Sequence, residues 1–586
     1  MNKINLKEKC VQLQIKDILS SDKKIFVPIY QRAYSWEVKN KSDSDKKQID
    51  IFLEDIKNHI NSRVISNFYL GNFLFQESEK GLAIIDGQQR LTTIIILLSV
   101  IKNITGEVAY DLDIENFSTT EYDNENFKKI ISGQIIKENT SYTLTNSTKK
   151  IINAYNFFKK SLEKLELKDI KKIENALLNA SCQINIISSE IEATQIFIFE
   201  NNRGVELTNL EIIKSMFMHY IYITEEEISF KDEMILNIEL KFSSIYKNIS
   251  YLEGYIREEA ILGIAFRIYK QKLKLQENII NEIEENISVE FINNFLSILE
   301  NTFSIICNFI LQGNDDLKDE EIYMIHSLIN LGISQEIYPI IVRVRDLKVK
   351  DSKILIRLYK ALEAILLRHN LVSTRANISQ RLEWEYSQLF EIDDYENKNE
   401  IEEKIINLIE IIEKLYKSRE TVYIDEDYYG YWWSYWTQDK FEIFLNNGLN
   451  NLKSTKYILW KYENYLRTEM NLKKIKYNEI KNYQVEHIAP KTENKNNING
   501  YPIYNEEFYS KYLNSFGNLL LLKEYINKKI GNADFEDKLK EYSKNNLYQS
   551  TEKELLKNNK LNKKWTVQRI KEREKEIKDF INRDLS

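Results

Sequence analysis

The stretch Gly81–Thr93, GLAIIDGQQRLTT, sets the first expectations for the fold. An apolar run, Leu82–Ile85, breaks at Asp86-Gly87, and an amphipathic run begins at Arg90. This order predicts a strand, a tight turn and the first turn of a helix. Glycine in such a turn permits a positive φ angle and the close approach of a ligand.

The same turn is a candidate site for an anion. The free N–H groups at the start of a helix, with Arg90 beside them, attract a group such as phosphate. The alternative is an ordinary turn capped by Asp86, with Arg90 on a solvated face, because turns with a single glycine are common. Both interpretations stay open on this stretch alone.

Composition indicates a large, mostly helical α+β chain. With 586 residues, 43% hydrophobic and 29% charged, it is long enough for several domains with sizeable cores. Its 15 glycines and 4 prolines are few, which favours long helices and few loops.

Cys10, Cys182 and Cys307 are far apart, which excludes a cysteine zinc site and a disulfide framework and fits a reducing cytosol. No signal peptide opens the chain and the apolar run Ile94–Ile101 is too short to span a bilayer, so we expect a soluble, cytoplasmic protein without a membrane partner.

Charge is divided unevenly along the chain. From Asn451 to Ser586, 28 Lys and Arg oppose 19 Asp and Glu, whereas the whole chain has a net charge of −7. A basic C-terminal piece on an acidic body indicates that this end contacts a polyanion. An ordinary solvated, lysine-rich surface is the alternative.

The pattern divides the chain into three predicted domains: an α/β domain over 1–225, a helical body over 226–425 and a C-terminal domain over 426–586. In the first, Phe68–Gln76 and Leu82–Asp86 predict a β-hairpin, and 106–145 is polar and expected to be irregular. Later in the same domain, Thr208 and Glu211 form a capping box ahead of a helix expected over 209–222.

The most aromatic stretch is Tyr428–Thr437, YYGYWWSYWT. Such a run can form a stacking platform for a nucleic-acid base. Aromatic residues at this density are more often part of a core or an interface, and that alternative is kept.

The C-terminal domain contains a strand–loop–strand–helix pattern. Tyr483–Pro490 predicts a short strand that ends at Glu486-His487, Asn514–Glu524 a Gly-Asn turn and an apolar strand, and 534–544 a helix. His487, Asn518 and Asn527 follow one another in the order of a ββα-metal (HNH) nuclease finger. Phosphodiester hydrolysis needs a general base, for which neutral imidazole is suited, and a divalent cation held by hard oxygen donors.

A structural histidine is the alternative at His487, although Glu486 and the basic surroundings favour catalysis. Without zinc-knuckle cysteines, the finger must be held by packing, for which Trp565 and the helix expected over 567–580 are candidates.

Four motifs together resemble the GmrSD-type family of modification-dependent (type IV) restriction and phage-defence proteins. They are Pro28–Trp36, Ile85–Thr93, Phe199–Leu207 with Ile212–Lys214, and Glu486–Pro490 with Gly517–Leu519. In that family an N-terminal ParB/sulfiredoxin-like nucleotide-binding domain is joined to a C-terminal HNH-like domain. Two departures are Glu211, where the third motif usually has Asp, and Lys491, where the fourth usually has Gln.

The resemblance implies binding or hydrolysis of an NTP in the first domain and metal-dependent nicking or cleavage of modified or phage DNA in the last. No motif selects one NTP base, and assembly as a homo-oligomer stays open. The metal would be Mg²⁺ or Mn²⁺. The residues implied to line the nucleotide cleft are Gln31, Arg32, Asp86, Gly87, Gln88, Gln89, Arg90, Asn201, Arg203 and Gly204.

In the C-terminal domain the resemblance implies that His487 is the general base. Glu486 and Asn527 would be metal ligands in this catalytic site, and Asn518 would orient the base or hold the loop. The alternative function is a DNA-binding NTPase sensor whose C-terminal domain binds DNA without cutting. Arg32 and Arg203 could equally form structural ion pairs, and Lys214 could be a solvated lysine rather than a ligand.

Overall fold

The structure is a computed structural model of the 586-residue chain. It describes every residue except 1–9, 21–22, 29–30, 40–44, 63–66, 79, 108–115, 135–143, 188–207, 276–277, 312–316, 373–375, 393–394, 396, 425–430, 447–451, 493–499, 502, 551–554, 556–563 and 586.

Contacts divide the chain into two compact units. The first contains residues 1–269 and 276–307, and the second contains 270–275 and 308–586. The boundaries near 225 and 425 expected from the sequence stay a prediction.

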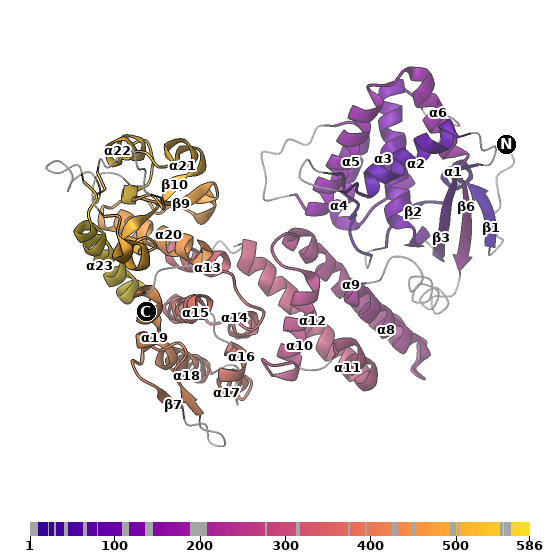
Figure 1. Cartoon of the computed structure of the whole chain (residues 1–586). Coiled ribbons are helices and arrows are strands. Elements are labelled where there is room, and N and C mark those ends of the chain that lie inside the picture. The colour runs from indigo at the N-terminus through magenta and orange to yellow at the C-terminus, as the bar shows by residue number, and fades with distance from the viewer. Residues whose placement is uncertain are drawn as a thin grey trace. The chain divides into compact units, whose positions relative to one another are not determined.

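The first unit is built on a six-stranded mixed sheet with the order β1-β6-β3-β4-β2-β5. Figure 1 shows β1, β6 and β3 side by side at one edge of this sheet. The β3–β4 pair is the antiparallel hairpin predicted from the sequence, and β3 also pairs in parallel with β6. The strands are β1 Cys10–Gln14, β2 Ile25–Phe26, β3 Tyr69–Ser78, β4 Gly81–Asp86, β5 Phe117–Ser118 and β6 Ser181–Ile187.

Six helices pack with this sheet around one apolar core. Helix α3 lies at its centre, since every residue from Leu91 to Ile101 is buried. Strand residues Phe73 and Phe75 stack in the same core with ring centroids 6.3 Å apart. The helices are α1 Ile15–Leu19, α2 Gln48–Asn61, α3 Gln88–Thr105, α4 Glu121–Ile131, α5 Asn146–Leu162 and α6 Leu167–Leu178.

A run of long helices completes the first unit. Thr208 and Glu211 form the capping box expected from the sequence at the start of α8. Helix α12 is long and apolar enough to cross a bilayer by length and composition, and half of its most apolar window is buried within the protein. The bounds are α8 Asn209–Ile223, α9 Ile228–Leu252, α10 Glu258–Lys270, α11 Ile279–Asn286 and α12 Val289–Leu311.

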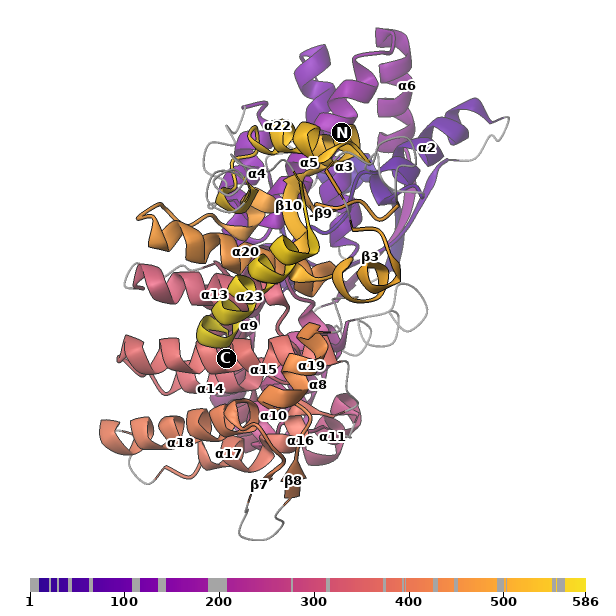
Figure 2. The same ribbon diagram turned by 60° about the vertical axis from the view of Figure 1, so that its left-hand side comes forward.

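The second unit begins with a helical layer in which α15 lies between α13 and α18 (Figures 1 and 2). A two-stranded antiparallel sheet, β7 Val422–Ile424 with β8 Tyr431–Trp433, follows. The helices of this part are α13 Asp319–Leu331, α14 Tyr338–Asp346, α15 Ser352–Val372, α16 Ile378–Arg381, α17 Glu383–Gln388, α18 Lys398–Lys417 and α19 Gln438–Asn446.

The C-terminal part is built around the antiparallel pair β9 Tyr483–His487 and β10 Leu519–Lys523. In this register His487 lies opposite Leu519, and Tyr483 lies opposite Lys523. Around the pair lie α20 Leu452–Glu469, α21 Glu524–Ile530, α22 Phe535–Tyr542 and α23 Val567–Asp584 (Figure 1). The short helices of this part are η3 Tyr477–Ile480, η4 Phe508–Tyr512, η5 Phe516–Asn518 and η6 Tyr548–Ser550.

Three local elements differ from the sequence expectations. Helix α4 lies within 106–145, which was expected to be irregular, because Phe127, Ile130 and Ile131 give this polar stretch one buried face. Strand β1 and helix α21 had no counterpart in the sequence expectations. Helix α21 follows β10 directly and carries Asn527. The aromatic run Tyr428–Thr437 lies partly outside the described residues, and within it Trp436 is fully buried, as in a core.

Candidate active site

The Asp86-Gly87 turn has the backbone conformation expected from the sequence. Gly87 is the N-cap of α3 and has φ +89°. A Cβ atom at this position would lie 2.5 Å from Cδ1 of Phe73. The local backbone and the neighbouring ring therefore require glycine here even without a ligand.

Glutamine side chains join the first and second sequence motifs. Gln31 donates through Nε2 to the backbone oxygen of Ile85 at 3.0 Å. Gln89 donates to the backbone oxygen of Ala33 at 3.0 Å and accepts from the backbone N–H of Ser35 at 2.8 Å. These amides fix the loop of the first motif against the start of α3, which is a role in positioning the loop.

Arg90 points towards β3 rather than along the axis of α3. Its Nη1 donates to the backbone oxygens of Leu70 and of Asn72, the latter at 3.2 Å. Its guanidinium also lies 5.2 Å from the ring centre of Phe73. Burial lowers the pKa of Arg90, although Asp86 opposes that effect. The expected anion contact at Arg90 stays a prediction, and in this structure the side chain joins α3 to β3.

Arg32 is the cation of the first motif that remains accessible, since its side chain is 34% exposed. Its Nε lies 3.2 Å from Oε1 of Glu211. The other oxygen of Glu211 accepts the backbone N–H of Thr208 at 2.9 Å and caps α8. Lys214, one turn later on α8, is buried, and burial lowers its pKa to about 8 while Glu211 and Glu239 act in the opposite direction. Lys214 is therefore not a solvated lysine.

The sequence did not indicate two further residues near this cluster. Burial raises the pKa of the Glu258 carboxyl on α10, which interacts with Thr208 and Arg32. The hydroxyl of Tyr246 on α9 is buried and has no hydrogen-bond partner among the described residues. Both lie in the stretch expected from the sequence to be only a helical body. Asn201, Arg203 and Gly204 lie outside the described residues.

Asp86 precedes the turn and is also perturbed by burial. Burial raises the pKa of its carboxyl, while the backbone N–H of Gly87 and the charge of Arg90 lower it. Gln88 donates to the backbone oxygen of Arg32 at 3.3 Å. All described members of the predicted nucleotide-binding set therefore lie in the first unit, at the junction of the first motif with α3 and α8.

His487 is the last residue of β9 in the second unit. Its Nε2 lies 3.1 Å from Oδ1 of Asn514. Burial lowers the pKa of His487 to about 4, Asn514 raises it, and the charges of Lys491 and Lys538 lower it further. The imidazole is therefore neutral near pH 7 and lies in a positive local potential.

Glu486 leaves the opposite face of β9, because consecutive strand residues alternate. Its Oε1 accepts from Nζ of Lys538 at 2.5 Å and from the hydroxyl of Tyr542 at 3.2 Å. Lys538 also donates to the backbone oxygen of His487 at 2.8 Å. Burial raises the pKa of Glu486 and lowers that of Lys538, and each charge opposes the shift of the other.

Asn518 is fully buried and joins the two sides of the loop between β9 and β10. Its Oδ1 accepts from the backbone N–H of Ala489 at 2.8 Å and from Nε1 of Trp565 at 3.1 Å. Its Nδ2 donates to the backbone oxygens of Ala489 at 3.2 Å and Leu513 at 2.9 Å. With every amide position used inside the protein, its contacts are those of a residue that holds the loop.

The adjacent Gly517 explains why the turn packs closely against α23. A Cβ atom there would lie 1.9 Å from the backbone oxygen of Ile570. Arg573, one turn further along α23, donates to the backbone oxygens of Phe516 at 2.8 Å and Leu519 at 2.6 Å. Packing by α23 and Trp565 was expected from the sequence, and the structure confirms it.

The predicted metal ligands do not form a metal site by themselves. Glu486 is occupied by Lys538 and Tyr542, and Asn527 donates through Nδ2 to Gln484 at 3.1 Å. In the part of the chain that the structure describes, no three His, Cys, Asp or Glu side chains are grouped to hold a metal ion. The residues as placed therefore do not fit the divalent ion that the resemblance implies.

Sequence reasoning missed Asn514, Lys538 and Tyr542, which hold His487 and Glu486. Lys538 and Tyr542 are four residues apart on α22 and both are buried. The sequence does place Lys538 on the apolar face of a short helix. Because a buried lysine needs an acidic partner, this position could have indicated an ion pair. For Asn514 the sequence has no comparable signal.

Comparison with known families defines the class of protein as a restriction endonuclease, an enzyme that acts on DNA. The N-terminal domain model of the GmrSD restriction endonuclease matches residues 15–218, and the C-terminal domain model of the GmrSD restriction endonucleases matches residues 436–580. The two matches cover more than half of the 586 residues. The chain belongs to the GmrSD restriction endonuclease family. A search of curated proteins found no match.

Proposed function

We propose that the chain is a nucleotide-regulated DNA endonuclease that nicks or cleaves modified or phage DNA, with His487 as the general base. The observation that supports this best is the half-buried imidazole of His487, which is neutral near pH 7 and whose Nε2 lies 3.1 Å from Oδ1 of Asn514. A base for water must be unprotonated at working pH and held in one orientation.

The contact with Asn514 gives the two ring nitrogens of His487 different roles. When Nε2–H of His487 donates to Oδ1 of Asn514, Nδ1 carries the lone pair that can take a proton from water. The charge of the exposed Lys491 favours a phosphodiester near this edge of β9. The activated water would then attack the phosphorus, and the 3′-oxygen would leave.

A divalent ion remains part of the proposal only as a requirement to be tested. Mg²⁺ or Mn²⁺ would stabilise charge on the phosphate and on the leaving oxygen. The Glu486 carboxylate is paired with Lys538 and is therefore not free to bind the ion. Removal of divalent ions by a chelator, followed by addition of Mg²⁺ or Mn²⁺, tests the requirement.

For the nucleotide, we propose a site at Arg32 in the first unit. Arg32 is a partly exposed cation of the predicted set, and its ion pair with Glu211 couples it to the start of α8. The buried ammonium of Lys214 adds positive charge from the same helix. Binding of an NTP phosphate at Arg32 would compete with Glu211 and so change the contacts of α8.

A plasmid-cleavage assay with each NTP, with and without Mg²⁺ or Mn²⁺, tests the proposal on unmodified and modified DNA. We expect His487→Ala to abolish cleavage and to leave NTP binding unchanged. His326→Ala is a matched control, because His326 is another half-buried histidine of the second unit whose pKa burial lowers. Equal cleavage by His487→Ala and the parent protein would refute the assignment. NTP turnover and DNA binding without cutting would instead support a DNA-binding NTPase sensor.

A further inference from the structure

A cavity of about 800 Å³ opens at the end of the β9–β10 pair that is remote from His487. Tyr483 and Lys523, which pair across the two strands, contribute to its lining. Because Tyr483 and His487 are four residues apart on β9, the cavity begins about 13 Å from the histidine along the strand. Both side chains leave the same face of β9, since strand residues alternate.

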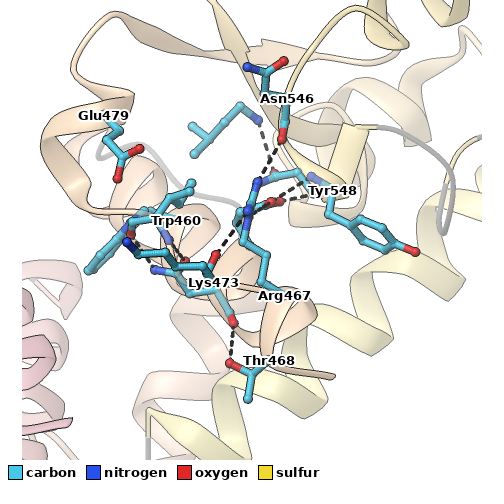
Figure 3. Close-up of polar contacts among 12 residues, drawn as sticks. Trp460, Arg467, Thr468, Lys473, Glu479, Asn546 and Tyr548 are labelled. Carbon is cyan, nitrogen blue, oxygen red and sulfur yellow. Dashed lines mark hydrogen bonds and ion pairs between the residues drawn. The ribbon is translucent and has the colours of Figure 1, made fainter. Parts of the chain in front are cut away.

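One wall of the cavity is fixed by Arg467 of α20. Its Nη2 donates to the backbone oxygen of Asn546 at 2.9 Å, its Nη1 donates to that of Lys473 at 3.2 Å, and its Nε contacts Glu463 at 2.8 Å (Figure 3). Glu463 also accepts the backbone N–H of Tyr548 at 2.7 Å. The wall is therefore formed before any ligand binds, and the charge of Arg467 is already neutralised.

The remaining charges of the lining are mostly paired. Lys528 contacts Glu524 at 2.6 Å on α21. Among the described residues, Lys523 makes no ion pair. A triphosphate requires several unpaired cations, so the cavity is unsuited to it. One available ammonium fits a ligand that brings a single phosphate.

The other lining groups are suited to a planar, polar ring. Tyr525 is 66% exposed on α21, which leaves a ring face available for stacking. Asn482 and Asn546 are exposed and lie in the same lining, where their amides can supply hydrogen-bond donors and acceptors. Ligand sites typically occupy about 300–1,000 Å³, so the size is adequate for a nucleotide base and its sugar.

We propose that this cavity takes one unstacked base of the DNA substrate, with Tyr525 stacking on the base and Lys523 contacting its phosphate. The inference rests on the proposed function, since it places the cut at His487. A separation of about 13 Å corresponds to about four nucleotides of duplex, so the extruded base lies within about four nucleotides of the cut.

The test uses three duplexes that differ at one position: fully paired, with a single-base bulge, and with a bulge that lacks its base. A bulged base needs no unpairing and therefore fixes where the protein binds. Affinities are measured by fluorescence anisotropy with His487→Ala, so that no DNA is cut. We expect the base bulge to bind about 5- to 150-fold more tightly than the baseless bulge, the range of one stacked base.

Tyr525→Ala in this background should remove that difference, and Tyr525→Phe should keep it. Tyr255→Ala is the matched control, because Tyr255 is 62% exposed in the first unit. Two outcomes would overturn the proposal: equal affinities of His487→Ala for the two bulged duplexes, or an affinity difference between these duplexes that Tyr525→Ala leaves unchanged. A parent protein that fails to cleave any DNA would overturn the proposed function instead, because the affinities do not depend on cutting.

Discussion

Replacing Gly87 by alanine should destabilise the first unit more than replacing Gly106 does. These two glycines flank the same helix, α3, and have nearly the same conformation, with φ +89° and φ +85°. A Cβ atom at Gly87 would lie 2.5 Å from the Phe73 ring, whereas one at Gly106 would meet nothing within 4 Å. The pair therefore separates backbone strain from steric contact.

The expected magnitudes follow from these two effects. A left-handed conformation costs a residue with a Cβ about 1–2 kcal/mol, which applies to both variants. Crowding in a packed core adds about 1–3 kcal/mol, and it applies only to Gly87→Ala. The smaller entropy of the unfolded chain favours both variants alike and cancels in the comparison. We therefore expect the free energy of unfolding to fall by about 2–5 kcal/mol for Gly87→Ala and by about 1–2 kcal/mol for Gly106→Ala.

Hydrogen exchange of the α3 amides across a urea series measures the free energy of unfolding locally, so the two units need not unfold together. Equal losses in the two variants would refute the steric reasoning. NTP affinity, measured where Gly87→Ala is folded, then shows whether the glycine also serves a ligand. An unchanged affinity would mean that Gly87 serves the fold of the turn alone.

Three further predictions concern charged and titrating groups. Because burial lowers the pKa of His487 from 6.5 to about 4, the cleavage rate should stay level between about pH 8 and 5, and an acidic midpoint near 6.5 in the pH–rate profile would contradict this. The contribution of His487 to the free energy of unfolding should decline as pH falls from 6.5 towards 4, because the unfolded chain then binds the proton more readily than the folded one. Lys538→Met should destabilise the β9–β10 region by about 3–5 kcal/mol in thermal unfolding, because it leaves the buried carboxylate of Glu486 without its partner. The additional change Glu486→Met should restore most of the lost stability, because it removes that unpaired carboxylate. Arg32→Ala should weaken NTP binding at least about tenfold in calorimetry, with Arg32→Lys intermediate, whereas equal affinities would exclude Arg32 from the site.

The sequence predicted the parts of the fold that depend on neighbouring residues. The hairpin before Gly87, the capping box at Thr208 and the strand ending at His487 are all local patterns, and the structure contains them. Helix α4 was missed because its few buried residues are spread through polar sequence.

The side-chain partners of the candidate site residues could not be predicted from neighbouring residues in the sequence. Lys538 is 52 residues from Glu486, and Asn514 is 27 residues from His487. Gln31 and Gln89 could be assigned to a motif but not to their backbone partners, because these contacts depend on how the chain folds back.

The two oxygens of Glu211 have separate tasks. Oε2 caps α8, while Oε1 contacts Arg32. A ligand that takes Arg32 away would therefore free one oxygen and leave the helix cap in place. Release of Arg32 would then act as a signal that alters the charge beside α8 without the cost of unwinding its first turn.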